Sequence, residues 1–117
     1  MSTFKYNNVY IKDYTTLVGP DEKVSKLKGF DASINDFYFG EKTFELAEIK
    51  MQRKVIDTIL SRNKLLESNI DLLLGGDLLN QLCITNTTAS NYYIPYLGLY
   101  SACATFNESL IVGANFI

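Results

Sequence analysis

The sequence has no histidine among its 117 residues. Histidine is the commonest general base in enzymes and the commonest metal ligand in proteins. The chain therefore lacks the side chain on which most acid–base catalysis and most metal sites depend. We expect it to bind no metal ion and to carry no cofactor.

Cysteine and long apolar runs are also scarce. The two cysteines, Cys83 and Cys103, make neither a disulfide framework nor a zinc site. The N-terminus has no extended apolar region typical of a signal peptide, and no stretch reaches the roughly 18 apolar residues of a membrane span. We therefore expect a cytoplasmic protein in which both cysteines are free thiols.

The net charge is small, and the sequence has no basic cluster. Hydrophobic residues make up 47% of the chain and charged residues 21%, with a net charge of −2. These values are ordinary for a globular protein, and the length suits one domain over residues 1–117. Without a basic cluster to neutralise phosphates, nucleic-acid binding is disfavoured.

A helix is expected to follow Thr43, which has the character of an N-cap. After it, Phe44, Ala47, Met51, Val55 and Ile59 recur at steps of three and four. This spacing predicts one buried apolar stripe on a helix that ends near Asn63 or Lys64.

Short apolar runs alternate with helical spacing in the second half. Residues 70–74 and 96–100 are predicted strands, and residues 84–94 and 104 onward are predicted helices. Earlier, residues 4–18 favour one or two strands, and residues 21–42 form a loop with a short helical piece whose position stays open. This order predicts an α/β fold with a mixed, mainly parallel sheet and flanking helices.

The last predicted helix has no stop signal, and the chain ends on Asn115-Phe116-Ile117. We expect a chain that is cut off within a larger fold. A C-terminus docked against the sheet is the alternative.

The step from strand to helix around Cys103 is the one place with an evident chemical role. Small neighbours, Ala102 and Ala104, allow a tight turn, and a helix N-terminus offers free N–H groups that favour anions and thiolates. An inert buried thiol is the alternative interpretation of Cys103. Cys83 has no such neighbours, and we expect it to pack in the core.

A second candidate site lies after the strand at residues 70–74. Asp77 follows Gly75-Gly76, and Asn80 comes three residues later, where open α/β sheets place their ligands. The alternative is that Asp77 caps the next turn with its carboxylate.

Three segments together resemble the stage V sporulation protein AD family. They are Val18-Gly19-Pro20-Asp21-Glu22-Lys23 with Phe30-Asp31, the helix start from Thr43 to Met51, and Gly76-Asp77-Leu78-Leu79-Asn80-Gln81 leading through Ile94-Pro95-Tyr96-Leu97 to Ser101-Ala102-Cys103-Ala104. The resemblance spans nearly the whole chain in one order. The family usually reads Gly-Ala-Cys-Ser at the last position, so this chain lacks a turn glycine and a hydroxyl there.

The resemblance implies the N-terminal portion of a thiolase-like layered fold, related to the ketoacyl synthase III enzymes. It implies a forespore protein, peripheral to the inner spore membrane, that binds dipicolinic acid and assists its uptake into the developing spore. The implied partners are other proteins of the spore-uptake complex and a second copy in a homodimer. Ligand contacts would come from Cys103, Ala104, Asp77 and Asn80.

Two other functions remain open. Cys103 matches the nucleophile of the condensing relatives, so acyl transfer through a thioester is one, although no histidine is present to activate the thiol. A structural fragment without function is the other. We expect binding rather than catalysis.

Overall fold

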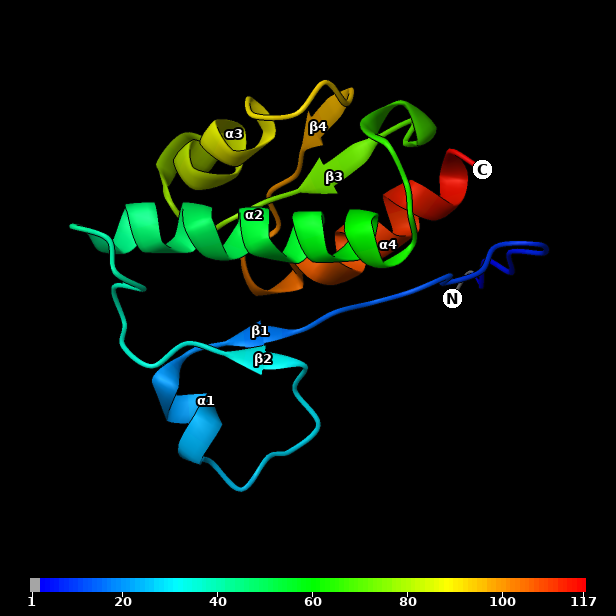
Figure 1. Ribbon diagram of the computed structural model, residues 1–117. Helices are drawn as coiled ribbons and strands as arrows, with labels where there is room; N and C mark the ends of the chain where they lie inside the picture. The colour runs from blue at the N-terminus through cyan, green and yellow to red at the C-terminus, as the bar shows by residue number, and fades with distance from the viewer. Residues whose placement is uncertain (1–2) are drawn as a thin grey trace.

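The computed structural model describes residues 3–117 as helices alternating with short parallel strands. Figure 1 shows their order along the chain. The elements are β1 (Leu17–Val18), α1 (Pro20–Val24), β2 (Ala32–Ser33), α2 (Phe44–Arg62), β3 (Leu73–Gly75), α3 (Cys83–Ala89), β4 (Tyr96–Gly98) and α4 (Thr105–Asn115), with 3-10 turns η1 (Glu67–Asn69), η2 (Asn80–Leu82) and η3 (Ala102–Ala104).

The strands form two separate pairs, and both pairs are parallel. β1 lies beside β2 with Leu17 opposite Ala32, and β3 lies beside β4 with Leu74 opposite Leu97. The connection from β3 to β4 runs through α3, as a parallel pair requires. The predicted α/β class and the parallel strands of the second half are therefore confirmed.

Helix α2 begins and ends where the sequence predicts. The Thr43 hydroxyl accepts a hydrogen bond from the Leu46 N–H at 3.3 Å, which satisfies one of the free donors of the first turn. At the other end, the N–H of Asn63 donates to the Ile59 carbonyl at 3.1 Å. Local signals suffice here because capping and periodicity both act within a few residues.

The predicted apolar stripe of α2 is only partly buried. Ala47 is 2% exposed, whereas Phe44 is 59% exposed, so its predicted burial is wrong. Phe44 extends from the first turn and stacks instead on Tyr38, with ring centroids 4.6 Å apart. Met51 and Val55 are half-buried because they line an open groove of about 520 Å³ between α2, β3 and α4.

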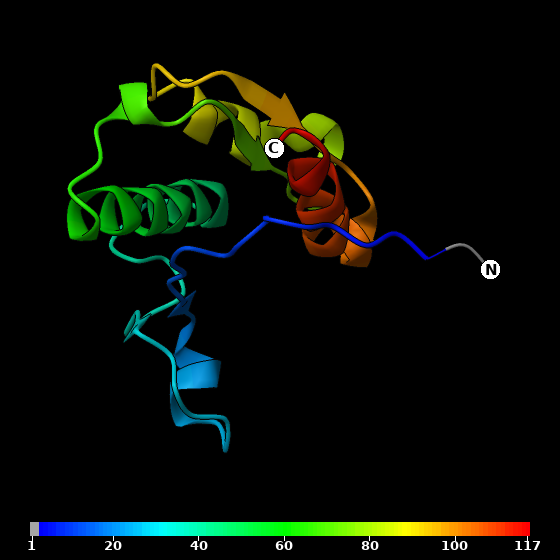
Figure 2. The same ribbon diagram turned by 90° about the vertical axis from the view of Figure 1, so that its right-hand side faces the viewer.

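The core lies where α2, α3 and the β3–β4 pair meet. Ile84 and Ala89 of α3 are buried there beside Ala47, together with Ile94 from the loop before β4. Figure 2 shows α2 on the left and α4 on the right, with β3 and β4 above the space between them. Within residues 3–117, no helix is long and apolar enough to span a bilayer.

The N-terminal segment differs most from its prediction. Residues 4–16 form no strand, and only Leu17–Val18 pairs with a neighbour. Asp13 is held instead by side chains at the end of α2: the Arg62 guanidinium donates to both carboxylate oxygens at 2.7 and 2.9 Å, and the Asn63 amide donates to one of them. Strand-forming side chains were present, but the described residues offer this segment no partner strand.

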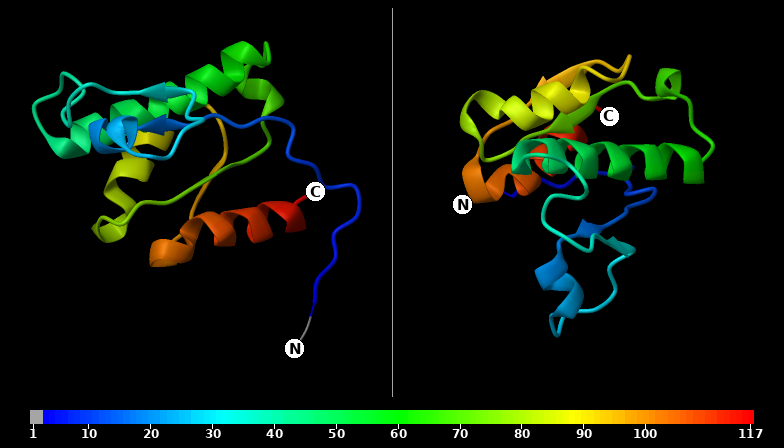
Figure 3. Two further views of the ribbon diagram at one scale, coloured as in Figure 1. Left: turned by 90° about the horizontal axis from the view of Figure 1, so that it is seen from below. Right: turned by 60° about the vertical axis from the view of Figure 1, so that its left-hand side comes forward.

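Residues 17–33 form a small lobe that projects from the rest of the molecule (Figures 1 and 3). The short helix expected within residues 21–42 is α1, with Pro20 at its first position. The Asp31 carboxylate fixes the lobe by accepting hydrogen bonds from the N–H and hydroxyl of Thr16 at 2.8 and 3.0 Å.

Candidate functional site

The two predicted site segments meet at one edge of the β3–β4 pair. Parallel strands end at the same edge, so the residues after β3 and those after β4 become neighbours. A Cβ on Gly76 would collide with the Leu99 carbonyl oxygen and lie 2.7 Å from Thr105 Cγ2. Only glycine therefore allows the end of β3 to pass this close to the start of α4.

Cys103 lies at the predicted place, in η3 between β4 and α4. Its side chain is exposed, so the interpretation of Cys103 as an inert buried thiol is wrong for this structure. The preceding Ala102 has φ 46°, a left-handed conformation that costs a non-glycine residue about 1–2 kcal/mol. The tight turn expected from small residues is thus present, and it is strained.

Thr105 holds this turn together, a role that the sequence analysis missed. Its hydroxyl donates to the Ala102 carbonyl at 2.8 Å and accepts from the Ser101 N–H at 3.0 Å. The Ala104 N–H adds a bond to the Ser101 carbonyl at 2.9 Å. A threonine in the first turn after a strand is a recognisable signal for such a local hydrogen bond.

The N-terminus of α4 has no side-chain cap. Ala104 stands at the N-cap position and has no side-chain hydrogen-bonding group, and the helix then runs for 11 residues. Uncapped N–H groups and the helix dipole together favour an anion at this end. Ala104 is exposed, so a ligand can approach this end of the helix, although the Ala104 N–H itself is bonded to the Ser101 carbonyl.

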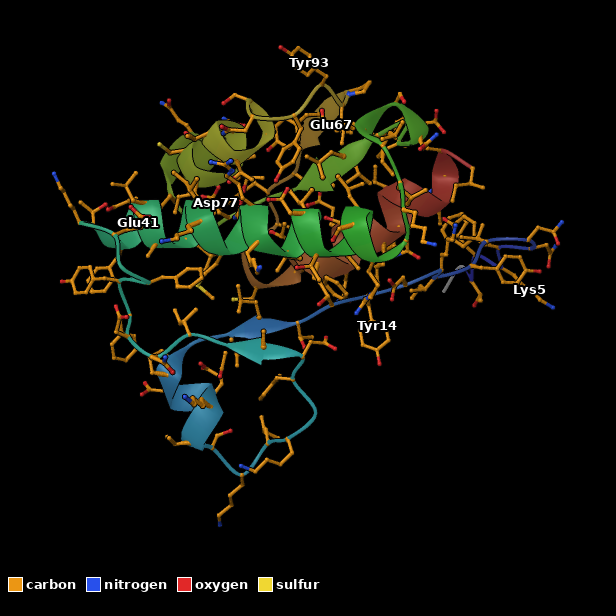
Figure 4. The ribbon with its side chains drawn as sticks, in the orientation of Figure 1. Lys5, Tyr14, Glu41, Glu67, Asp77 and Tyr93 are labelled. Carbon is orange, nitrogen blue, oxygen red and sulfur yellow. The ribbon has the colours of Figure 1, made fainter. Side chains whose placement is uncertain are left out.

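Asp77 is buried, with 6% of its surface exposed, and lies between α2 and α3 (Figure 4). One carboxylate oxygen accepts from the N–H and the hydroxyl of Thr85, both at 2.7 Å, and the other accepts from the Leu79 N–H at 2.8 Å. These hydrogen bonds agree with the interpretation that Asp77 caps the next turn, because Thr85 belongs to the first turn of α3. Contact with a ligand stays a prediction, and the side chain of Asn80 lies outside the described residues.

The negative charge of Asp77 affects two neighbours that the sequence did not indicate. Partial burial, and then the charge of Asp77, raises the pKa of Glu48 above its usual value. Burial and the same charge raise the pKa of the Tyr96 hydroxyl. Glu48 comes from α2, so no spacing along the chain could have linked it to Asp77.

The loop between Asp77 and α3 is strained. Gln81 and Leu82 are consecutive left-handed residues, with φ of 60° and 53°. Such conformations cost about 1–3 kcal/mol each and persist only where the surroundings enforce them. Both residues line a small cavity of about 270 Å³, together with Tyr100 from beyond β4.

The part of the chain that carries Cys103 is poor in positive charge. The chain has no lysine or arginine after Lys64, whereas residues 65–117 include Glu67, Asp71, Asp77 and Glu108. An anion at this edge would therefore depend on backbone N–H groups. No group of three possible metal ligands occurs within the described part of the chain.

Cys83 is not the core residue that the sequence predicts. It is exposed and forms the first residue of α3, whose inward face carries Ile84 and Thr88, each 1% exposed. Helical spacing turns Cys83 away from that face. Its carbonyl accepts a hydrogen bond from the Thr87 hydroxyl at 2.8 Å.

Comparison with known proteins gives a consistent match. The family model described as stage V sporulation protein AD matches residues 2–117. The chain is also 34% identical over 107 residues to the stage V sporulation protein AD of Bacillus subtilis (strain 168). This match covers 91% of the chain but 32% of the relative, so the chain spans about a third of the relative's length.

Proposed function

The chain belongs to the stage V sporulation protein AD family, and from this sporulation role we propose that it binds dipicolinic acid and assists its uptake into the developing spore. The observation that carries the proposal is the uncapped N-terminus of α4 beside the end of β3. Dipicolinate is a planar dianion, and N–H groups at a helix N-terminus are suited to carboxylates.

The proposed ligand contacts are the turn of Cys103 and Ala104, together with the segment of Asp77 and Asn80. The N–H groups of Ser101, Ala104 and Thr105 are already bonded within the turn, so N–H groups further into the first turn of α4 would hold a carboxylate, and the exposed Cys103 side chain would line the site. Asp77 would act by position, because its carboxylate already fixes the start of α3 through Thr85.

We extend the proposal to the longer protein that the relative represents. Its architecture would be the thiolase-like layered fold, assembled as a homodimer. It would act in the forespore, beside the inner spore membrane, with the other proteins of the uptake complex. These features rest on the family resemblance, since the chain spans 32% of the relative.

Titration with dipicolinate tests the proposal on two variants of one residue. Cys103→Phe should weaken binding by obstruction, whereas Cys103→Ser should bind as the wild type does, because binding needs no nucleophile. Incubation with an acyl-CoA, followed by mass spectrometry, tests the alternative. An acylated wild type and an unreacted Cys103→Ser would support acyl transfer, and equal dipicolinate binding by the Phe variant would refute the proposed site.

A further inference from the structure

A second hollow lies on the outer face of α2, away from the Cys103 turn. It has a volume of about 580 Å³, and its apolar lining comes from Phe39, Leu46 and Ile49. Lys50, Arg53 and Lys54 line it as well, so cations and an aromatic ring share one surface. We call this hollow the α2 groove.

Lys50 builds one wall of the α2 groove. Its ammonium donates to the Phe39 carbonyl at 2.8 Å and pairs with Glu41 at 2.9 Å. It also lies 4.8 Å from the centroid of the Phe39 ring, within cation–π range. These contacts hold Phe39 in a left-handed conformation with φ 50°, next to the start of α2, where Figure 4 shows Glu41.

The two carboxylates of the groove are already engaged. Glu41 pairs with Lys50, and Asp57 accepts a hydrogen bond from the Tyr92 hydroxyl at 2.8 Å. Burial and the Asp57 carboxylate raise the pKa of Tyr92 to about 12, so this hydroxyl remains a donor at neutral pH.

Arg53 and Lys54 are left as adjacent cations. Neither forms an ion pair with a carboxylate within the described residues, whereas Arg62 of the same helix forms an ion pair with Asp13. The segment of the Cys103 turn has no such cations, because no lysine or arginine follows residue 64. The α2 groove therefore offers a small aromatic dianion an apolar aromatic wall and a net positive charge, since Lys50, Arg53 and Lys54 outnumber Glu41 and Asp57 by one.

We propose that the α2 groove is a second binding site, for small planar aromatic dicarboxylates. The aromatic body of the ligand lies against Phe39, Leu46 and Ile49, and its carboxylates meet Arg53 and Lys54. A guanidinium binds a carboxylate with two parallel hydrogen bonds, which fixes orientation as well as charge. The choice of ligand class rests on the proposed function, whereas the site is separate from it.

The test uses dipicolinate with the 117-residue chain and follows amide signals by NMR. Wild-type signals of residues 39 and 49–54 should shift on titration, and more weakly at high salt because charge attraction is screened. The Arg53→Gln/Lys54→Gln variant should bind about tenfold more weakly at these residues. The control pair, Lys12→Gln/Lys26→Gln, makes the same charge change outside the groove and should bind there as the wild type does.

The outcomes separate the two sites. Shifts near residues 39 and 49–54 that are lost in the groove variant, but kept in Cys103→Phe, support the α2 groove whatever happens at residues 101–106. Shifts confined to residues 101–106 overturn the groove and leave the proposed function standing. An equal loss in the control pair, or no shift near residues 39 and 49–54 at any concentration, also overturns the groove.

Discussion

Replacing Asp77 by alanine removes one carboxylate that accepts three hydrogen bonds. Thr85 loses the acceptor for its N–H and its hydroxyl, and it is itself buried at 6% exposure. A buried donor without a partner costs about 1–3 kcal/mol. We therefore expect Asp77→Ala to lower the free energy of unfolding by about 2–5 kcal/mol, a large share of the stability of a small domain.

Urea unfolding followed by far-UV circular dichroism measures this loss as a change in the midpoint at an unchanged slope. Asp71→Ala is the matched control, because Asp71 is an exposed carboxylate that also lies in the connection between α2 and α3. The control should change stability by no more than about 0.5 kcal/mol. If Asp77→Ala matches the control, the hydrogen bonds to Thr85 do not stabilise the fold and our account of Asp77 is wrong.

Three further predictions concern other parts of the chain. Thr43→Ala should cost about 1 kcal/mol in urea unfolding through loss of the α2 cap, and an unchanged midpoint would contradict the capping bond. Gly76→Ala should destabilise by about 1–3 kcal/mol, since its Cβ would collide with the Leu99 carbonyl; a neutral effect would mean that the backbones separate easily. Asp13 has a lowered pKa because Asn63, and then Arg62, donate to it. Its stabilising effect is present above the ordinary pKa of 3.8 and is lost as the pH falls through the lower folded value. Asp13→Asn should therefore flatten the fall of thermal stability between about pH 5 and 2, and an identical profile in both proteins would count against the Asp13 contacts.

The parts of the fold that were predicted correctly depend on local signals. The bounds of α2 follow from a cap and a period that both act within a few residues. The place of Cys103 at the start of the last helix follows from an apolar run and small residues beside it. Such signals predict an element from the sequence alone, without knowledge of what the chain packs against.

The incorrect predictions depend on partners distant in the chain. Residues 4–16 have strand-forming side chains, but a strand forms only where a second one lies beside it. Phe44 belongs to the apolar period of α2, yet it stacks on Tyr38 outside the core. The influence of Asp77 on Glu48, which the sequence did not indicate, joins two different elements.

The confinement of every lysine and arginine to residues 1–64 gives the molecule an electric asymmetry. Residues 65–117 contribute only negative side chains, so the part containing β3, β4 and α4 is anionic, while every positive side chain lies on the part containing the lobe and α2. A molecule of this kind carries a dipole moment even though its net charge is only −2. Near a negatively charged surface at low ionic strength it experiences a torque that turns its α2 side inward, before any atom touches. At physiological salt the torque acts only within about 8 Å of the surface, so the protein approaches to that distance with random orientation.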